Sequence, residues 1–195
     1  METLTRIKMN QKEQTEAILK NISTMLAKRG LITNSNSTFN DLKKISSKNT
    51  FSWKENKREF LVLIYFQSMT GIKKGSEVES KLLKSKADHK FLILQNFTNK
   101  TITQTKEFKT ELFLTNEFLV DLSSVPFIPK HTILSEKDKE ELLKIYPEKN
   151  LAKIFSNDMM VRYHGAKVGD IMKIFRPSFN TGESIYYRKV VLAKK

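Results

Sequence analysis

The chain has no cysteine among its 195 residues, and it has only six glycines and four prolines. The lack of cysteine excludes disulfides, thiolate zinc sites, iron–sulfur clusters and cysteine nucleophiles. No glycine-rich phosphate-binding motif and no Gly-x-Ser-x-Gly sequence occurs. The three histidines, His89, His131 and His164, are too scattered to suggest a metal site. We therefore predict no catalytic, cofactor or metal site.

Long hydrophobic runs are also missing. The longest apolar run covers residues 60–66, whereas a membrane span needs about 20 apolar residues. Charged residues occur throughout the N-terminal segment, which therefore lacks the apolar centre of a signal peptide. We expect a soluble intracellular protein with no membrane partner and no small-molecule substrate.

Basic residues outnumber acidic ones by 35 to 21, which gives a net charge of +14. The charge is spread over the chain, with +8 on residues 1–124 and +6 on residues 125–195. A basic tail is therefore excluded. Apolar residues make up 39% and long polar tracts are absent, so the chain is expected to fold. The charge favours a polyanionic partner, either nucleic acid or an acidic protein surface, or burial of the basic surface in an assembly.

Apolar spacing in the first half predicts alternating helices and strands. The pattern indicates a helix over 11–30, a short helix on Phe39, Leu42 and Ile45 capped by Thr38 or Asn40, and a loop over 46–58. A strand over 60–66, a helix over 77–86 and a strand over 90–95 follow in βαβ order. Further strands are expected at 109–114 and 117–122.

Pro126 and Pro129 mark a boundary, which we place between 124 and 125. Beyond it we expect a short strand at 133–134, a helix that begins at Ser135 and ends at Pro147, and a helix capped by Ser156 or Asp158. That second helix ends at His164 and Gly165. Strands are predicted at 171–176 and 184–192. His131 is interpreted as a structural histidine that hydrogen-bonds to the backbone.

An acid two residues before a lysine is typical of metal-dependent nucleases. Asp88-His89-Lys90 and Glu107-Phe108-Lys109 fit this spacing. Five such pairs occur, a small excess over chance that carries little weight, and the strand over 60–66 offers no second acid. Solvated surface charge is therefore the preferred interpretation.

Lysines gather around the helix over 77–86 and can neutralise phosphates in salt-sensitive contacts. Together with one lysine of the segment that follows the next strand, they are our candidates for contact with DNA: Lys73, Lys74, Lys81, Lys84, Lys86 and Lys100.

The second half resembles a known family. The matching positions include Phe127 to His131, Glu140 to Leu143, Val161 to Tyr163, Arg176-Pro177-Ser178 and Tyr187 to Val191, in order and spacing over about 65 residues. This pattern is similar to the fifth-subunit family of the eukaryotic nuclear RNA polymerases, whose archaeal counterpart consists of this domain alone.

The first half is similar more loosely. Lys28-Arg29-Gly30 matches the basic pair and glycine that end the first helix of the family. After the strand over 90–95 the family has an Asn-x-Thr-Pro-Ser-Ala segment, but residues 96–101 lack its proline and alanine. Ala152 and Met159 also stand where the family usually has proline.

The resemblance implies an α/β (α+β) protein of two domains. Residues 1–124 would form a nuclease-like α/β jaw domain near downstream duplex DNA. Residues 125–195 would form a small α/β assembly domain with a mixed sheet. This domain would dock on the largest polymerase subunit, beside neighbouring small subunits. The chain would not form homo-oligomers. The candidates for this interface are Pro129, Lys130, His131, Arg162, Tyr163, Gly165, Gly169, Lys173, Arg176, Tyr187 and Arg188.

Arg176 and Arg188 lie on adjacent predicted strands and can form bidentate pairs with carboxylates of a partner. The resemblance implies a non-catalytic subunit in the nucleus, or in a cytoplasmic viral factory or virion if a virus encodes it. The alternatives are a stand-alone basic nucleic-acid-binding protein and a degenerate nuclease.

Overall fold

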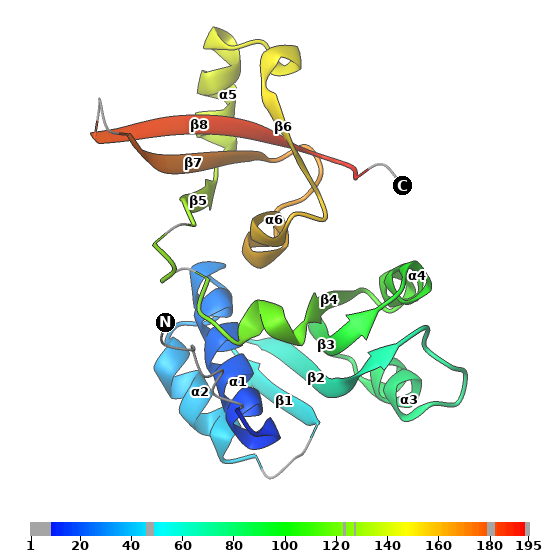
Figure 1. The fold of residues 1–195 in the computed structure, drawn as a ribbon. Coiled ribbons are helices and arrows are strands. Elements are labelled where there is room, and N and C mark those ends of the chain that lie inside the picture. The colour runs from blue at the N-terminus through cyan, green and yellow to red at the C-terminus, as the bar shows by residue number, and fades with distance from the viewer. Residues whose placement is uncertain (1–8, 46–48, 123, 127, 179–181, 194–195) are drawn as a thin grey trace, which may run out of the picture. The chain divides into compact units, whose positions relative to one another are not determined.

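The computed structural model describes residues 9–45, 49–122, 124–126, 128–178 and 182–193. The chain divides into two compact units, residues 1–121 and 122–195, whereas the sequence pattern places the boundary at 124/125. Both units contain helices and a four-stranded sheet, so the protein is of the α/β class (Figure 1).

The sheet of the first unit has the order β1-β2-β3-β4. β1 (Thr50–Glu55) and β2 (Arg58–Met69) are antiparallel. β3 (His89–Phe97) is parallel to β2, and β4 (Thr110–Leu114) is parallel to β3. α3 (Glu77–Lys84) and α4 (Asn99–Glu107) make the two parallel crossovers. The predicted strand–helix–strand unit is therefore confirmed, with β2 and β3 longer than expected.

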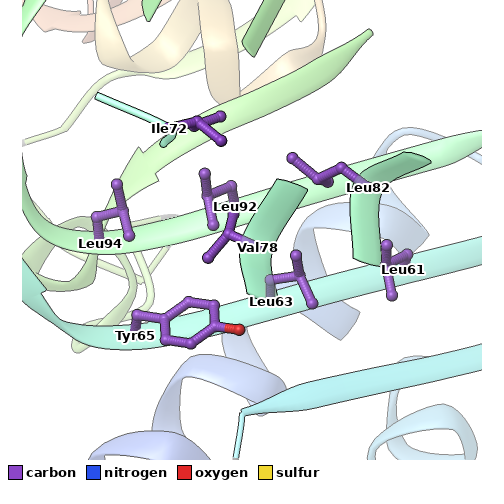
Figure 2. Packing of buried hydrophobic residues seen from close by; sticks show 8 residues of the cluster. All are labelled: Leu61, Leu63, Tyr65, Ile72, Val78, Leu82, Leu92 and Leu94. Atoms are coloured by element: carbon purple, nitrogen blue, oxygen red, sulfur yellow. The ribbon is translucent and has the colours of Figure 1, made fainter. Parts of the chain in front are cut away.

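The central residues of β2, 60–65, are all apolar and buried, as expected for a strand that is covered on both faces. Figure 2 shows Leu61, Leu63 and Tyr65 on the face that packs against Val78 and Leu82 of α3. The alternate residues point to the opposite face, and they are almost fully buried as well: Phe60, Val62 and Ile64.

The opposite face belongs to the two N-terminal helices, α1 (Gln11–Lys28) and α2 (Ser35–Lys43). Asn10 and Glu13 form a reciprocal capping box at the start of α1. The side chain of Arg29, which follows α1, lies over the Phe91 ring on this face, 5.8 Å from its centroid. The predicted helix over 11–30 is confirmed. The second helix begins earlier than expected, because Asn34 accepts the amides of Asn36 and Ser37 and caps it.

The predicted loop over 46–58 is wrong for residues 50–55, which form β1, and residues 46–48 lie outside the described residues. Asn56 and Lys57 join β1 to β2 with φ values of 51° and 62°. Two successive left-handed residues make the tight turn that suits a two-residue hairpin. The usual sequence signal for this turn is Asn-Gly, so the lysine in the second position concealed it.

Three more elements differ from the sequence-based expectation. Residues 99–107 form the helix α4, to which the pattern assigned no structure. The strand expected at 117–122 is wrong, because a short 3-10 helix occupies Thr115–Phe118. The strand β6 (Ala152–Phe155) was also not anticipated, since four residues carry too little periodicity.

The second unit has a mixed sheet in the order β5-β7-β8-β6. β5 (Lys130–Ile133), β7 (Ile171–Ser178) and β8 (Gly182–Val191) are antiparallel, and β6 is parallel to β8. The remaining elements are α5 (Glu136–Ile145), the 3-10 turn η2 (Glu148–Asn150) and α6 (Met159–His164). Their core contains Ile154, Val161, Met172, Ile174 and Val190.

The predicted helix ends in the second unit are confirmed. Ser135 accepts the Asp138 amide at the start of α5, and Asp158 accepts the Met160 amide at the start of α6. Gly165 follows α6 with a left-handed φ of 70°, which glycine adopts without the strain of a Cβ atom.

Candidate functional site

Exposed apolar side chains are concentrated on the second unit, although it is the smaller one. Residues 1–121 contribute Leu83, Ile102 and Val120. Residues 122–195 contribute more than twice as many: Ile133, Ile145, Tyr146, Phe155, Val168, Ile185, Tyr186 and Leu192. Single exposed apolar residues are common, but such a density on a small unit is typical of a surface that a partner covers.

The strand register assigns the polar candidates to the two faces of the second sheet. Arg176 lies opposite Ser184, Ile174 opposite Tyr186, and Met172 opposite Arg188. Directly opposed residues point to the same side of a sheet. Arg176, Tyr186 and Arg188 therefore share one face, which we call the arginine face together with His131, the neighbour of Ile174 on β5.

Two charged groups, the guanidiniums of Arg176 and Arg188, lie on this face. The Arg176 guanidinium lies over the Tyr186 ring, 5.0 Å from its centroid. Among the described residues, neither Arg176 nor Arg188 has an ion pair with a carboxylate. Arginine without an internal partner keeps its planar donors for a carboxylate or phosphate of another molecule.

His131 belongs to the interior of the arginine face. Its Nδ1 lies 2.6 Å from the Pro129 carbonyl oxygen and donates to it, because a carbonyl can only accept. Burial lowers the pKa of His131, the Pro129 hydrogen bond and Asp158 act to raise it, and Arg176 and Arg188 lower it further. A neutral, backbone-bonded histidine results, which confirms the structural interpretation of this residue.

The other predicted interface residues are divided among several environments. Lys130, Lys173 and Tyr187 point to the face opposite the arginine face, where both lysines lie over the Phe175 ring. Tyr163 is 2% exposed and belongs to the core. Pro129 precedes β5 and accepts the His131 hydrogen bond. Arg162 of α6 donates to the Asn157 carbonyl, and Gly165 and Gly169 have positive φ after that helix.

The candidate DNA lysines form two groups in the first unit. Lys73 and Lys74 are exposed in the turn before α3. Gln104 of α4 bonds both the amide and the carbonyl of Ile72, and the stem of Lys100 runs beside Gly71. Lys100 therefore comes next to the turn that carries Lys73 and Lys74. Lys84 and Lys86 are exposed at the other end of α3.

Lys81 differs from the other five lysines. Its amine is bonded to Glu77 and to the Thr50 hydroxyl, the latter at 2.6 Å, and it lies near the Tyr65 ring. Burial acts to lower the pKa of Lys81, but the bonds to Glu77 and Tyr65 outweigh it and the pKa is raised. Lys81 is therefore a cation tied between α3 and the sheet.

The nuclease-like spacing serves the fold. The Asp88 carboxylate accepts the Glu59 amide at 2.8 Å, and the Lys90 amine donates to the Leu82 carbonyl at 2.9 Å. Glu107 is the last residue of α4. In the described ranges no three histidine or acidic side chains gather closely enough to hold a metal ion, and no helix there has the length and hydropathy to cross a bilayer.

Sequence reasoning missed Tyr186 and Gln104. Tyr187 belongs to the family motif and Tyr186 does not, so only Tyr187 was chosen as a candidate. Period-two alternation in a strand places Tyr186 on the same face as Arg188. Gln104 lies in α4, which the pattern did not reveal.

Comparison with known proteins identifies the family. Residues 120–190 match the model of the RNA polymerase Rpb5 C-terminal domain. The chain is 31% identical over 200 residues to DNA-directed RNA polymerase subunit 5 of Acanthamoeba polyphaga mimivirus, which covers 97% of this chain and 98% of that protein. It is 48% identical over 66 residues to subunit Rpo5 of Archaeoglobus fulgidus, covering 33% of this chain and 87% of the archaeal one. The match to the Dictyostelium discoideum subunit rpabc1 of RNA polymerases I, II and III is 38% over 91 residues, 46% of each chain.

The archaeal match covers one third of this chain, whereas the mimivirus match runs through both units. The chain belongs to the subunit 5 family of DNA-directed RNA polymerases.

Proposed function

We propose that the chain is a non-catalytic subunit of a multisubunit DNA-directed RNA polymerase, whose active site lies on other subunits. The assembly domain, residues 125–195, docks on the largest subunit beside neighbouring small subunits. The jaw domain, residues 1–124 with a nuclease-like fold, lies near downstream duplex DNA.

The arginine face carries the docking part of the proposal. Arg176 and Arg188 share one sheet face, and among the described residues no carboxylate pairs with either of them. Exposed apolar side chains are concentrated on the same unit. Apolar contact area together with bidentate arginine pairs is the combination that protein interfaces use.

The DNA-contact part rests on Lys73, Lys74 and Lys100. These lysines are exposed, they are brought to one place by α4, and they have no ion pair in the described chain. Phosphate contacts of this kind position a duplex without reading its sequence. The proposed locations are the nucleus, or a cytoplasmic viral factory or virion if the gene is viral.

Affinity purification through a tag on this chain tests the proposal. We expect the largest polymerase subunit to co-purify with the wild-type chain. Arg188→Glu should reduce its recovery by about tenfold, because a buried like-charge contact costs more than about 1.4 kcal/mol. Lys149→Glu, an exposed residue of η2 with the same charge change, is the control. A chain that purifies alone, or bound only to nucleic acid, would contradict the proposal and favour the stand-alone binder.

A further inference from the structure

The outer edge of β8 is the strongest unexplained feature of the second unit. β6 pairs with residues 188–191 of β8, while β7 pairs with β8 over its whole length. In the described chain no strand pairs with β8 at residues 185–187 on the side away from β7. Figure 1 shows β7 and β8 running together well past the end of β6. We call residues 185–187 on this side the open edge.

Hydrogen bonds at the neighbouring positions show which backbone groups point to the open edge. The Val190 amide donates to the backbone carbonyl of Asp170. The backbone groups of even-numbered β8 residues therefore bond to β7 in this register. The Ser156 amide donates to the Val191 carbonyl, so odd-numbered residues point the other way. The amides of Ile185 and Tyr187 and the carbonyl of Ile185 therefore point away from β7.

The sequence of the open edge does not protect it. Soluble proteins guard edge strands with lysine, proline or other charges. Lys54 lies on β1, Lys153 on β6, and Lys130 on β5 directly after Pro129. The open edge is Ile185-Tyr186-Tyr187, with strongly strand-forming and uncharged side chains. Ile185 is 46% exposed and Tyr186 is 47% exposed.

The positive charge of Arg176 and Arg188 beside the open edge favours an acidic partner segment. Tyr186 belongs to the arginine face, between Arg176 and Arg188 along the two strands. A strand added to the open edge would place alternate side chains next to this face. Acidic side chains at those positions would meet two arginines that have no ion pair in the described residues.

We propose that the open edge of β8 receives an extended, acidic segment of the largest polymerase subunit, which extends the sheet by one strand. The inference rests on the proposed role as a polymerase subunit and names how that contact is made. Main-chain hydrogen bonds supply the affinity, and the arginine face selects acidic side chains.

Hydrogen exchange at single amides tests this pairing with an internal control. The amides of Ile185 and Tyr187 should exchange at least about tenfold more slowly in the purified polymerase than in the isolated chain, because they gain acceptors. The amides of Tyr186 and Arg188 bond to β7 and should be protected in both. Equal exchange of Ile185 in the two samples would refute strand addition while leaving the subunit role intact.

Two variants give a second, independent test. Ile185→Pro removes an amide that the β7 ladder does not use, and proline is tolerated at such edge positions. We expect recovery of the largest subunit to fall by about tenfold with Ile185→Pro and to change little with Ile185→Thr, which keeps the amide. Normal incorporation of the proline variant would refute the inference.

The remaining outcomes are also decisive. Protection of Ile185 in the isolated chain that grows with concentration would mean that a second copy occupies the edge, which contradicts the proposed occupant. A wild-type chain that never co-purifies with large subunits removes the proposed function and this inference together.

Discussion

At the scale of single residues, one ion pair holds the end of α1 to the first sheet. Both terminal nitrogens of Arg29 donate to Glu111 at 2.8 Å, and the Arg29 side chain is 6% exposed. A cation this deeply buried loses little to solvent screening, so removing the carboxylate that pairs with it through two hydrogen bonds is costly.

We expect Glu111→Ala to lower the free energy of unfolding by about 2–4 kcal/mol, which urea titration will measure. Asp41→Ala removes the partner of Lys44 in an exposed pair and should cost less than about 1 kcal/mol. Equal effects of the two substitutions would contradict the role of burial.

His89 gives the first unit a pH dependence with a defined sign. Burial lowers its pKa below the usual 6.5, and Arg58 and Arg29 lower it further, while Glu111 and Asp88 act to raise it. The unfolded chain therefore binds more protons than the native one near this pH. The stability contributed by neutral His89 is present above pH 6.5 and is lost as the pH falls below it.

The urea concentration at the unfolding midpoint should therefore decrease when the pH is lowered from about 7.5 to about 5.5. The decrease should be smaller in His89→Gln. Trp53 is the only tryptophan and stacks on Phe60, which stacks on His89. Its fluorescence reports on the first unit alone. An unchanged pH response in the variant would remove His89 as the titrating group.

At the scale of elements, α3 depends on one apolar stripe. Two adjacent leucines have opposite environments, since Leu82 is 1% exposed in the core of Figure 2 and Leu83 is 66% exposed. Leu82→Ala should lower the free energy of unfolding by about 2–5 kcal/mol, because it removes packing and leaves a cavity.

Leu83→Ala is the matched control, with an expected change below about 0.5 kcal/mol. Chemical denaturation followed by Trp53 fluorescence measures both variants. Similar losses would mean that α3 does not pack as the structure describes.

At the scale of the whole molecule, the net charge of +14 is divided into +8 on residues 1–124 and +6 on residues 125–195. We propose DNA contact for the first part and protein contact for the second. Replacing Lys73, Lys74 and Lys100 with Glu should weaken retention of downstream duplex by the assembled polymerase and flatten its salt dependence, because fewer counterions are released.

The control variant replaces Lys137, Lys144 and Lys149 of the second unit with Glu. It has the same net charge as the first variant. Filter binding at several salt concentrations measures both. Equal retention by the two triple variants would assign the effect to net charge and remove these three lysines from the DNA contact.

Much of this fold could be predicted from the sequence because its signals are local. Capping residues such as Asp158, the glycine after α6 and the apolar run of β2 act within a few residues of themselves. The α/β class and the family motif in the second half rest on such patterns.

Only the tertiary structure decided which residues act together. β1 needs β2 beside it, and its turn uses a lysine where glycine is usual. Lys81 resembles any other solvated lysine until β1 and β2 bring Thr50 and Tyr65 to it. The register of β7 on β8 puts Arg176 and Arg188 on one face and leaves the open edge at Ile185. Pairing and register depend on contacts between residues far apart in the chain, which local patterns do not encode.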